Sequence, residues 1–473
     1  MRTATKICLP LLLLMGTCAV SLSGCGTTTN DPSTLNVICL NAGYGSTWIK
    51  SLASTWEAAN PNYKINLNAS YDAPTLIQQH LASKNNTDDL YISVGASWKS
   101  YAAQDKFLSL DDLLSDTVDG KTVKERVNPE YQQSLAYQGS DGTKHAYRLP
   151  WTAGVGGIYY NAKMFADNGW KVPTTYDELT TLISTIKTAN LPVDGDLTAT
   201  VKPFVYTGKN TDYFDYAVFT WWSQLTGIDS IETFLKYTDA TVYDHTVSGS
   251  AYAALETATN LWYNIFKDSG NYVEGSGDKS NHQAQQNFLN GYSAMMFDGE
   301  WLYNEMLGYT TAGKLPDSFS LKIMPTPTAP NAKYSGTSYI VGEDQFIAIP
   351  SSSSKADLAK SFIKTIISDA GCDTFLKEAH GMMAYTFDPS KAGSDDVFVN
   401  SLIDYQKGIT STFTNYSTSL LYLSDIIDIW GTSAMRPFAG LLTDGSKSVS
   451  SSFDTIKSET ARNWDAWKRQ AGL

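Results

Sequence analysis

Residues 34–69 read TLNVICLNAGYGSTWIKSLASTWEAANPNYKINLNA, and this stretch decides the fold class. It opens with a short apolar run at 34–40, which is typical of a buried strand. Apolar residues then recur at helical spacing over 47–59, and Asn60-Pro61-Asn62 ends that helix. Residues 63–69 alternate between apolar and polar side chains, as a second strand does. The order strand, helix, strand predicts a βαβ unit with parallel strands.

The same alternation continues beyond this stretch. Helical spacing covers 74–83 and 97–105, and an apolar run at 88–94 separates the two helices. This order predicts an α/β fold in which helices cover both faces of a parallel sheet. Ligands of such open sheets bind beyond the carboxyl ends of the strands. Tyr44 and Trp98 follow two of these ends, so both are candidate ligand-binding residues.

The rest of the chain is richer in helical patterns. Single strands are expected near 294–298 and 345–349, and the C-terminal segment 448–470 has the spacing of an amphipathic helix. The other helical patterns cover 175–189, 213–225, 231–237, 250–267, 283–291, 299–307, 355–368, 370–379, 396–407 and 421–443.

The N-terminus has the pattern of an export signal. Arg2 and Lys6 precede an apolar core at 7–22. Pro10 and the short length of this core argue against a permanent membrane-spanning helix, which needs about 20 apolar residues. We therefore interpret residues 1–24 as a signal peptide.

The end of this signal resembles a bacterial lipobox. It reads Leu22-Ser23-Gly24-Cys25, in which small residues precede a cysteine that would accept a diacylglycerol. Residues 25–34 then form the lipidated Cys25 and a polar tether, although ordinary cleavage beside a coincidental cysteine is the alternative. The folded body keeps Cys39 and Cys372, which could pair but are more typical of isolated buried thiols.

Composition excludes several classes of function. The chain of 473 residues has a formal net charge of -13, which disfavours nucleic acid as a partner. Its mean hydropathy of -0.23 excludes a polytopic membrane protein. No metal-ligand spacing and no nucleophile elbow occur in the sequence, so we expect no metal, no cofactor and no enzymatic activity.

Four stretches of the body carry a family resemblance. The first is WEAANPNYKINL at 56–67, and the second joins DDLYI at 88–92 to YAAQDKFLSLDDL at 101–113. The third runs from LPW at 149–151 through YYNAKMF at 159–165 to PTTYDEL at 173–179. The fourth is FLNGYSAMMFDGEW at 288–301, with PTP at 325–327 and IAIP at 347–350. In this order, over roughly 35–470, they resemble family 1 of the extracellular solute-binding proteins of ABC importers, the maltose-binding-protein-like receptors that mostly bind sugars.

The resemblance implies a two-lobe α/β fold of the second periplasmic-binding-protein class, with a ligand cleft between the lobes. Lobe one would comprise 35–147 plus about 305–348. Lobe two and the C-terminal helices would comprise 148–304 plus about 349–473. The protein would be a monomeric receptor, anchored by lipid on the extracytoplasmic face of the cell membrane. It would capture a small-molecule ligand, expected to be an oligosaccharide, and deliver it to the permease subunits.

The chemistry of sugars points to individual cleft residues. A sugar ring offers apolar C–H faces to aromatic rings and hydroxyl groups to acids. The chain has 12 Trp and 28 Tyr, most of which must lie in the core. The resemblance places Trp301 at the cleft, flanked by Asp298 and Glu300 as hydroxyl acceptors. Alternatively, the ring packs the start of a helix and the acids cap that helix.

Three further tryptophans are candidates. Trp430 would lie on a helix that sugar-binding members use to present a ring, although it could equally pack between helices. Trp151 follows Pro150, where the chain would cross between the lobes. Of the adjacent pair at 221–222 only one ring can face a ligand, and we favour Trp222.

Two other functions fit the same residues. A surface glycoside hydrolase also needs a cleft with aromatic rings and two carboxyl groups. Within the binding class, a polyamine, an amino acid or a peptide could replace the sugar as the ligand.

Overall fold

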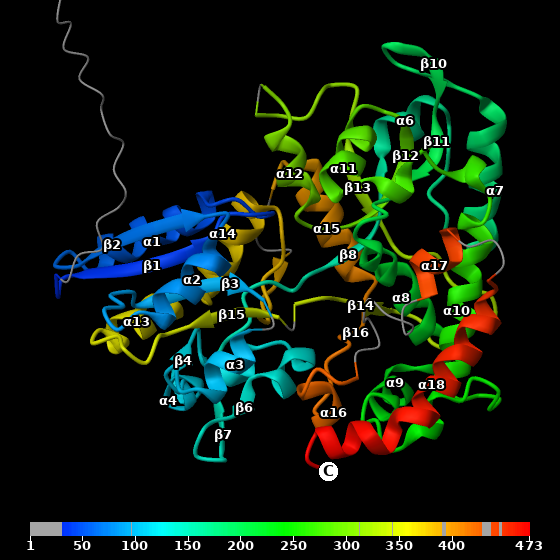
Figure 1. Ribbon diagram of the computed structural model, residues 1–473. Helices are drawn as coiled ribbons and strands as arrows, with labels where there is room; N and C mark the ends of the chain where they lie inside the picture. Colours follow the sequence, from blue (N-terminus) through cyan, green and yellow to red (C-terminus); the bar gives the residue numbers. More distant parts are fainter. Residues whose placement is uncertain are drawn as a thin grey trace, which may run out of the picture.

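Two four-stranded sheets, each with its own helices, organise the chain (Figure 1). The computed structural model describes residues 31–473 except 96, 312, 343, 390–393, 428–436 and 444–446. The expected signal peptide, the lipidated Cys25 and the candidate Trp430 therefore lie outside the described residues. In the part of the chain that the structure describes, no helix has the length and apolar character needed to cross a membrane.

The first sheet confirms the predicted βαβ order. β1 pairs in parallel with β2 on one side and with β3 on the other, and β15 joins β3 in the antiparallel direction. The strand order is β15-β3-β1-β2, so a segment from far along the chain completes this sheet. Its strands are β1 (Thr34–Leu40), β2 (Lys64–Ser70), β3 (Leu90–Val94) and β15 (Gln345–Ala348).

Helix α1 (Thr47–Ala59) shows why this lobe folds as the sequence predicts. Trp48, Leu52 and Trp56 recur on one helical face, and all three side chains are buried. The other helices that belong to this lobe are α2 (Ala73–Ala82), α3 (Trp98–Ala103), α4 (Asp111–Ser115), α5 (Val123–Arg126), α13 (Ala356–Ile366) and α14 (Asp369–Ala379). Two hairpins complete the lobe, made by β4 (Thr117–Val118) with β5 (Lys121–Thr122) and by β6 (Ala136–Gln138) with β7 (Lys144–Ala146).

The place of α13 and α14 corrects the expected lobe boundaries. We expected the chain from about 349 onward to belong to lobe two, but both helices pack against α1. Phe362 of α13 and Phe375 of α14 are buried in the same apolar core as β1 and β3. The reason is that their apolar faces fill a surface of the first sheet that would otherwise be open to water.

The second sheet has the order β11-β12-β8-β13. β12 is parallel to β11 and antiparallel to β8, and β13 is antiparallel to β8. We expected about 305–348 to lie in lobe one, and β13 corrects this because Leu321, Ile323 and Met324 are buried in lobe two. The strands are β8 (Gly156–Asn161), β11 (Lys202–Val205), β12 (Ser293–Gly299) and β13 (Leu321–Met324).

The second lobe carries most of the helices. They surround an aromatic-rich core in which Phe204, Phe214, Phe266 and Phe297 lie in contact. The helices are α6 (Ala162–Asp167), α7 (Tyr176–Ala189), α8 (Asp215–Thr226), α9 (Ile228–Phe234), α10 (Ala251–Phe266), α11 (Asn281–Leu289), α12 (Leu302–Gly308), α15 (Val397–Lys407), α16 (Leu420–Leu423), α17 (Pro437–Thr443) and α18 (Val449–Gln470). Short strands pair as β9 (Pro192–Val193) with β10 (Asp196–Thr200) and as β14 (Thr337–Tyr339) with β16 (Ser411–Phe413).

Three segments cross between the lobes and bond to one another. The central one contains Leu149, whose backbone N–H donates to the carbonyl of Ile347 at 3.0 Å. The segment around Met382 is the third. The backbone N–H of Ala153, in the central segment, donates to the carbonyl of Met382 at 2.7 Å, so the central segment is bonded to both of the others. This narrow hydrogen-bonded ribbon is where one lobe would turn against the other.

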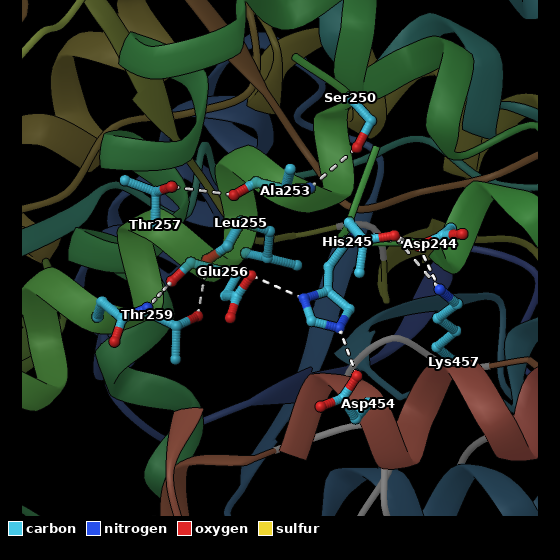
Figure 2. A network of polar contacts seen from close by, with 12 residues as sticks. Asp244, His245, Ser250, Ala253, Leu255, Glu256, Thr257, Thr259, Asp454 and Lys457 are labelled. Carbon is cyan, nitrogen blue, oxygen red and sulfur yellow. Dashed lines mark hydrogen bonds and ion pairs between the residues drawn. The ribbon is translucent and has the colours of Figure 1, made fainter. Parts of the chain in front are cut away.

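Helix α18 is joined to the second lobe by a buried histidine. Figure 2 shows His245 between Glu256 of α10 and Asp454 of α18, with Nδ1 2.8 Å from Oε2 of Glu256 and Nε2 3.1 Å from Oδ1 of Asp454. A neutral imidazole has only one N–H, so donating to both carboxylates requires the protonated ring. Lys457 and Asp244 form a second ion pair beside it, at 2.7 Å.

The cysteine prediction is confirmed in its commoner form. Cys39 of β1 and Cys372 of α14 are both buried and unpaired. Burial raises the pKa of the Cys372 thiol to about 12, which keeps it inert.

Candidate binding cavity between the lobes

A cavity of about 390 Å³ lies between the two sheets, and both lobes line it. The residues contributed by the first lobe and the crossing segments are Leu40, Ala42, Gly43, Tyr44, Val94, Trp151, Val341, Asp344 and Gln345. The residues contributed by the second lobe are Asp212, Tyr213, Asp215, Tyr216, Trp301, Glu305, Tyr339 and Asn415.

The cavity lies where strand topology predicts a ligand site. Val94 ends β3, and Tyr44 lies in the turn that follows β1, as expected for Tyr44 from the sequence. In the second lobe, Tyr213 follows the end of β11 and Trp301 follows the end of β12. The carboxyl ends of parallel strands from both sheets therefore converge on one space.

Trp301 lies at the centre of the aromatic lining. Its ring meets the ring of Tyr44 edge-on at 6.1 Å and the ring of Tyr213 edge-on at 6.2 Å, so it contacts both lobes. The side chain is half-buried, which leaves part of the ring open to the cavity. Gly299 permits this position, because a Cβ there would lie 2.3 Å from the far edge of the indole.

Tyr44 and Trp151 form the first-lobe side of this lining. The two rings meet edge-on at 5.4 Å, and the ring of Trp151 stacks on Trp48 at 5.8 Å. The indole N–H of Trp151 donates to the carbonyl of Ser93 at 3.0 Å. Both side chains are almost fully buried, so they shape the wall of the cavity.

Glu300 lies behind the wall and holds several elements together. Its carboxyl group accepts hydrogen bonds from the Tyr44 hydroxyl at 2.9 Å, the Thr152 hydroxyl at 3.3 Å and the Met382 backbone N–H at 2.9 Å. Burial raises the pKa of Glu300 to about 8, although these hydrogen bonds oppose the rise. The side chain of Glu300 is fully buried and does not line the cavity, which corrects the expectation that it accepts hydrogen bonds from a ligand. Glu300 instead connects Tyr44 to the crossing segments through its hydrogen bonds.

Asp298 is also set back from the cavity. It is fully buried and accepts hydrogen bonds from the Gly299 backbone N–H at 2.7 Å and from Nε2 of Gln285 at 3.1 Å. Burial raises its pKa well above the ordinary value, and the nearby charge of Glu305 raises it further. The structure therefore corrects the expectation that Asp298 meets the ligand directly.

Two of the candidate tryptophans belong to the cores. Trp98 is fully buried, with the Arg148 guanidinium 4.5 Å above its ring. Trp222 is fully buried in the second lobe, where its indole N–H donates to the carbonyl of Ala251 at 2.6 Å and its ring meets Phe234. Neither lines the cavity, so the expectation that they face a ligand there is wrong.

Sequence reasoning missed the segment TDYFDY at 211–216. It supplies Asp212, Tyr213, Asp215 and Tyr216 to the cavity, in the stretch of chain that follows β11 and 206–210. Because ligands bind beyond the carboxyl ends of parallel strands, this segment would have been a candidate if 202–205 had been identified as a strand. The ring of Tyr216 packs over Gly156, where a Cβ would lie 2.2 Å away, and its buried hydroxyl has no hydrogen-bond partner among the described residues.

The charge of the lining is negative. Carboxyl groups come from Asp212, Asp215, Glu305 and Asp344, and no Lys, Arg or His is among the described residues that line the cavity. Burial raises the pKa of Glu305, and Nε2 of Gln285 donates to it at 2.6 Å. The described residues contain no cluster suited to a metal ion.

Comparison with known proteins gives one family. The model of the bacterial extracellular solute-binding proteins matches residues 41–371, which is more than half of the chain. The multiple sugar-binding protein of Streptococcus mutans is 25% identical over 140 residues. That alignment covers 29% of this chain and 30% of the relative, so the chain matches less than a third of the length of this curated relative.

Solved structures of the same architecture cover nearly the whole chain. A chitin oligosaccharide binding protein has a TM-score of 0.64 at 18% identity, and the match covers 93% of this chain and 100% of that one. The solute-binding protein RafE in complex with raffinose has a TM-score of 0.61 at 14% identity, covering 90% and 99%. These likenesses establish the two-lobe fold that the sequence predicted.

Proposed function

The chain belongs to the bacterial extracellular solute-binding protein family, and we propose that its interlobe cavity binds an oligosaccharide for delivery to an ABC importer. The observation that carries this proposal is the aromatic lining built by both lobes. Trp301 contacts Tyr44 of one lobe and Tyr213 of the other, and acids lie beside these rings. This combination suits the apolar faces and hydroxyl rims of sugar rings.

The size of the cavity agrees with a ligand of this kind. Its volume of about 390 Å³ falls within the range of roughly 300–1,000 Å³ that is usual for small-molecule sites. The names of the similar proteins mention multiple sugars, chitin oligosaccharide and raffinose, which supports carbohydrate as the ligand class here.

Delivery requires a change of shape that a membrane partner can detect. The three crossing segments form a narrow ribbon, so the lobes can turn about it while each core stays intact. A ligand that touches both lobes favours the closed arrangement, because it gains contacts there that the open arrangement lacks. The permease then distinguishes the loaded receptor from the empty one by its shape.

The place of action follows from the N-terminal pattern. Cys25 carries the lipid that anchors a monomeric receptor to the extracytoplasmic face of the cell membrane, and the residues around 25–34 act as its tether. The receptor binds its ligand without chemical change.

A calorimetric panel tests the proposal. Neutral oligosaccharides of different linkage are titrated into the body of the protein, and each sugar is recovered afterwards by chromatography. We expect at least one to bind and to return intact, and Trp301→Ala to weaken its binding. The matched control is Trp467→Ala, which removes a half-buried indole from α18. Cleavage of the sugar would contradict a pure binding role, and equal loss in both variants would contradict a cavity site.

A further inference from the structure

The acidic residues that line the cavity differ in whether a positively charged side chain lies near them, and this difference bears on the ligand. On the crossing side, burial raises the pKa of Asp344, and the charge of Arg148 lowers it, with a smaller contribution from Lys99. On the second-lobe side, Asp212, Asp215 and Glu305 line the cavity. Most of the acidic side chains that line the cavity therefore belong to the second-lobe wall.

One amide serves two carboxyl groups of the second lobe. Nε2 of Gln285 donates to Glu305 at 2.6 Å and to Asp298 at 3.1 Å. The hydroxyl of Tyr309 donates to Oε1 of Gln285 at 2.7 Å, which fixes the amide with its NH₂ group toward the acids. The exposed side chain of His282 lies near enough to oppose, in part, the rise that burial causes in the pKa of Glu305. The amide holds the carboxyl groups in place but adds no positive charge to balance them.

Aromatic faces adjoin the same wall. Tyr213 and Trp301 meet edge-on at 6.2 Å, and Tyr213 lies within the field of Asp298, Glu305 and Asp212. Tyr216 also lines the cavity, and its buried hydroxyl has no hydrogen-bond partner among the described residues. Acids and electron-rich ring faces together form the usual surroundings of a bound organic cation.

We propose that the oligosaccharide bound in this cavity carries a protonated amine, which lies against Asp212, Glu305 and the ring faces of Tyr213 and Trp301. This inference rests on the proposed function, because it specifies the class of sugar. A neutral ligand would remove water from ionised carboxyl groups without replacing its hydrogen bonds in full. An ammonium group supplies three donors and a charge of the opposite sign. The same wall repels sugars that carry carboxylate or phosphate groups.

Sugar pairs that differ only in the amine provide the test. Glucosamine oligomers are compared by calorimetry with N-acetylglucosamine oligomers of equal length, at about pH 5.5, because neighbouring oxygens make sugar amines weaker bases than lysine and a mildly acidic buffer is needed to keep them charged. The free amine should bind roughly ten- to a hundredfold more tightly, as close charge pairs at interfaces do. Its affinity should fall as salt is added, whereas the affinity of the acetylated sugar should not. Galactosamine oligomers, spermidine and a neutral panel including raffinose and maltotetraose complete the set.

Two variants locate the effect on the protein. Glu305→Gln keeps the shape and the contact with Gln285 but removes the charge, so it should abolish most of the preference for the amine. Asp177→Asn removes an exposed acid from the first turn of α7 and should leave the preference unchanged. A variant that still folds but keeps the full preference would contradict the assignment to Glu305.

The remaining outcomes separate this inference from the proposed function. Equal or tighter binding of neutral sugars overturns the amine but leaves an oligosaccharide receptor. Binding of spermidine without any sugar overturns both the proposed function and the amino-sugar assignment, and makes the chain a polyamine receptor. Failure of every amine-bearing compound, whether or not a neutral sugar binds, also overturns the inference.

Discussion

Replacing Trp301 with alanine should weaken oligosaccharide binding more than it weakens the fold. The ring is half-buried and lies between Tyr44 and Tyr213, so a bound sugar would cover its remaining exposed part. Stacking contributes about 0.5–1.5 kcal/mol beyond area. Covering roughly 40–60 Å² of apolar ring adds about 1–1.5 kcal/mol. The sum, about 1.5–3 kcal/mol, corresponds to a loss of affinity of roughly ten- to a hundredfold.

The same substitution has a smaller cost for folding. Complete loss of a core tryptophan costs about 3–5 kcal/mol, and a half-buried ring should cost roughly 1–2 kcal/mol. Calorimetric titration measures the affinity, and urea unfolding without ligand measures the stability. Trp301→Phe retains a ring and should fall between the wild type and alanine in affinity. If alanine instead loses several kcal/mol of stability and keeps its affinity, Trp301 is a packing residue and the aromatic lining is not the binding surface.

Four further predictions address the anchor, two titrating groups and the hinge. Cys25→Ala should release the body from membranes or leave the signal uncleaved, since an acyl chain supplies the anchoring energy; unchanged membrane retention and mass would refute lipidation. Burial alone would lower the pKa of His245, but its hydrogen bonds to Glu256 and Asp454 raise it above the ordinary value. The ion pairs of protonated His245 should stabilise the folded state by about 1 kcal/mol, a small amount because Asp454 is largely exposed. This stabilisation should be complete below about pH 6.5 and lost as the pH rises through the folded pKa. His245→Gln should remove this pH dependence from the free energy of unfolding, and an unchanged pH dependence in the variant would contradict the assignment. The pKa of Glu300 is also raised, in this case by burial, to about 8. The folded state therefore keeps a proton that the unfolded chain releases near the ordinary pKa of a glutamate. The free energy of unfolding should fall as the pH rises between these two pKa values. Glu300→Gln should flatten that decline, and an unaltered slope would show that another group causes it. Small-angle scattering should show a smaller radius of gyration at ligand saturation, and an unchanged curve with binding confirmed by calorimetry would refute hinge closure.

The first lobe could be predicted because its signals are local. The strand at 34–40 and the helix at 47–59 have the bounds that periodicity gave them, since each has one clearly apolar face. The lobe boundaries could not be predicted in the same way. β13 is four residues long, and its pairing with β8 depends on which edge is open in the folded protein. The apolar faces of α13 and α14 likewise do not encode which lobe they will cover.

The site was predictable where it follows a recognised strand. Tyr44 and Trp301 line the cavity because they lie in the turns that follow β1 and β12. Trp222 was misplaced because an apolar aromatic residue looks the same in a sequence whether it faces a ligand or a core. Asp212 and Tyr213 were missed because the short β11 carries too weak a pattern to mark its end. Burial of Asp298 and Glu300 is a property of tertiary packing that spacing alone does not reveal.

A crystal structure of the protein with the tightest-binding oligosaccharide from the panel tests the central claim most directly. We predict sugar rings in the cavity between the lobes, in contact with Trp301 and Tyr44 and with hydroxyl or amine groups at Asp212 and Glu305. Density for the sugar in another hollow, or an empty cavity at saturating ligand, would contradict the claim that this cavity is the receptor site.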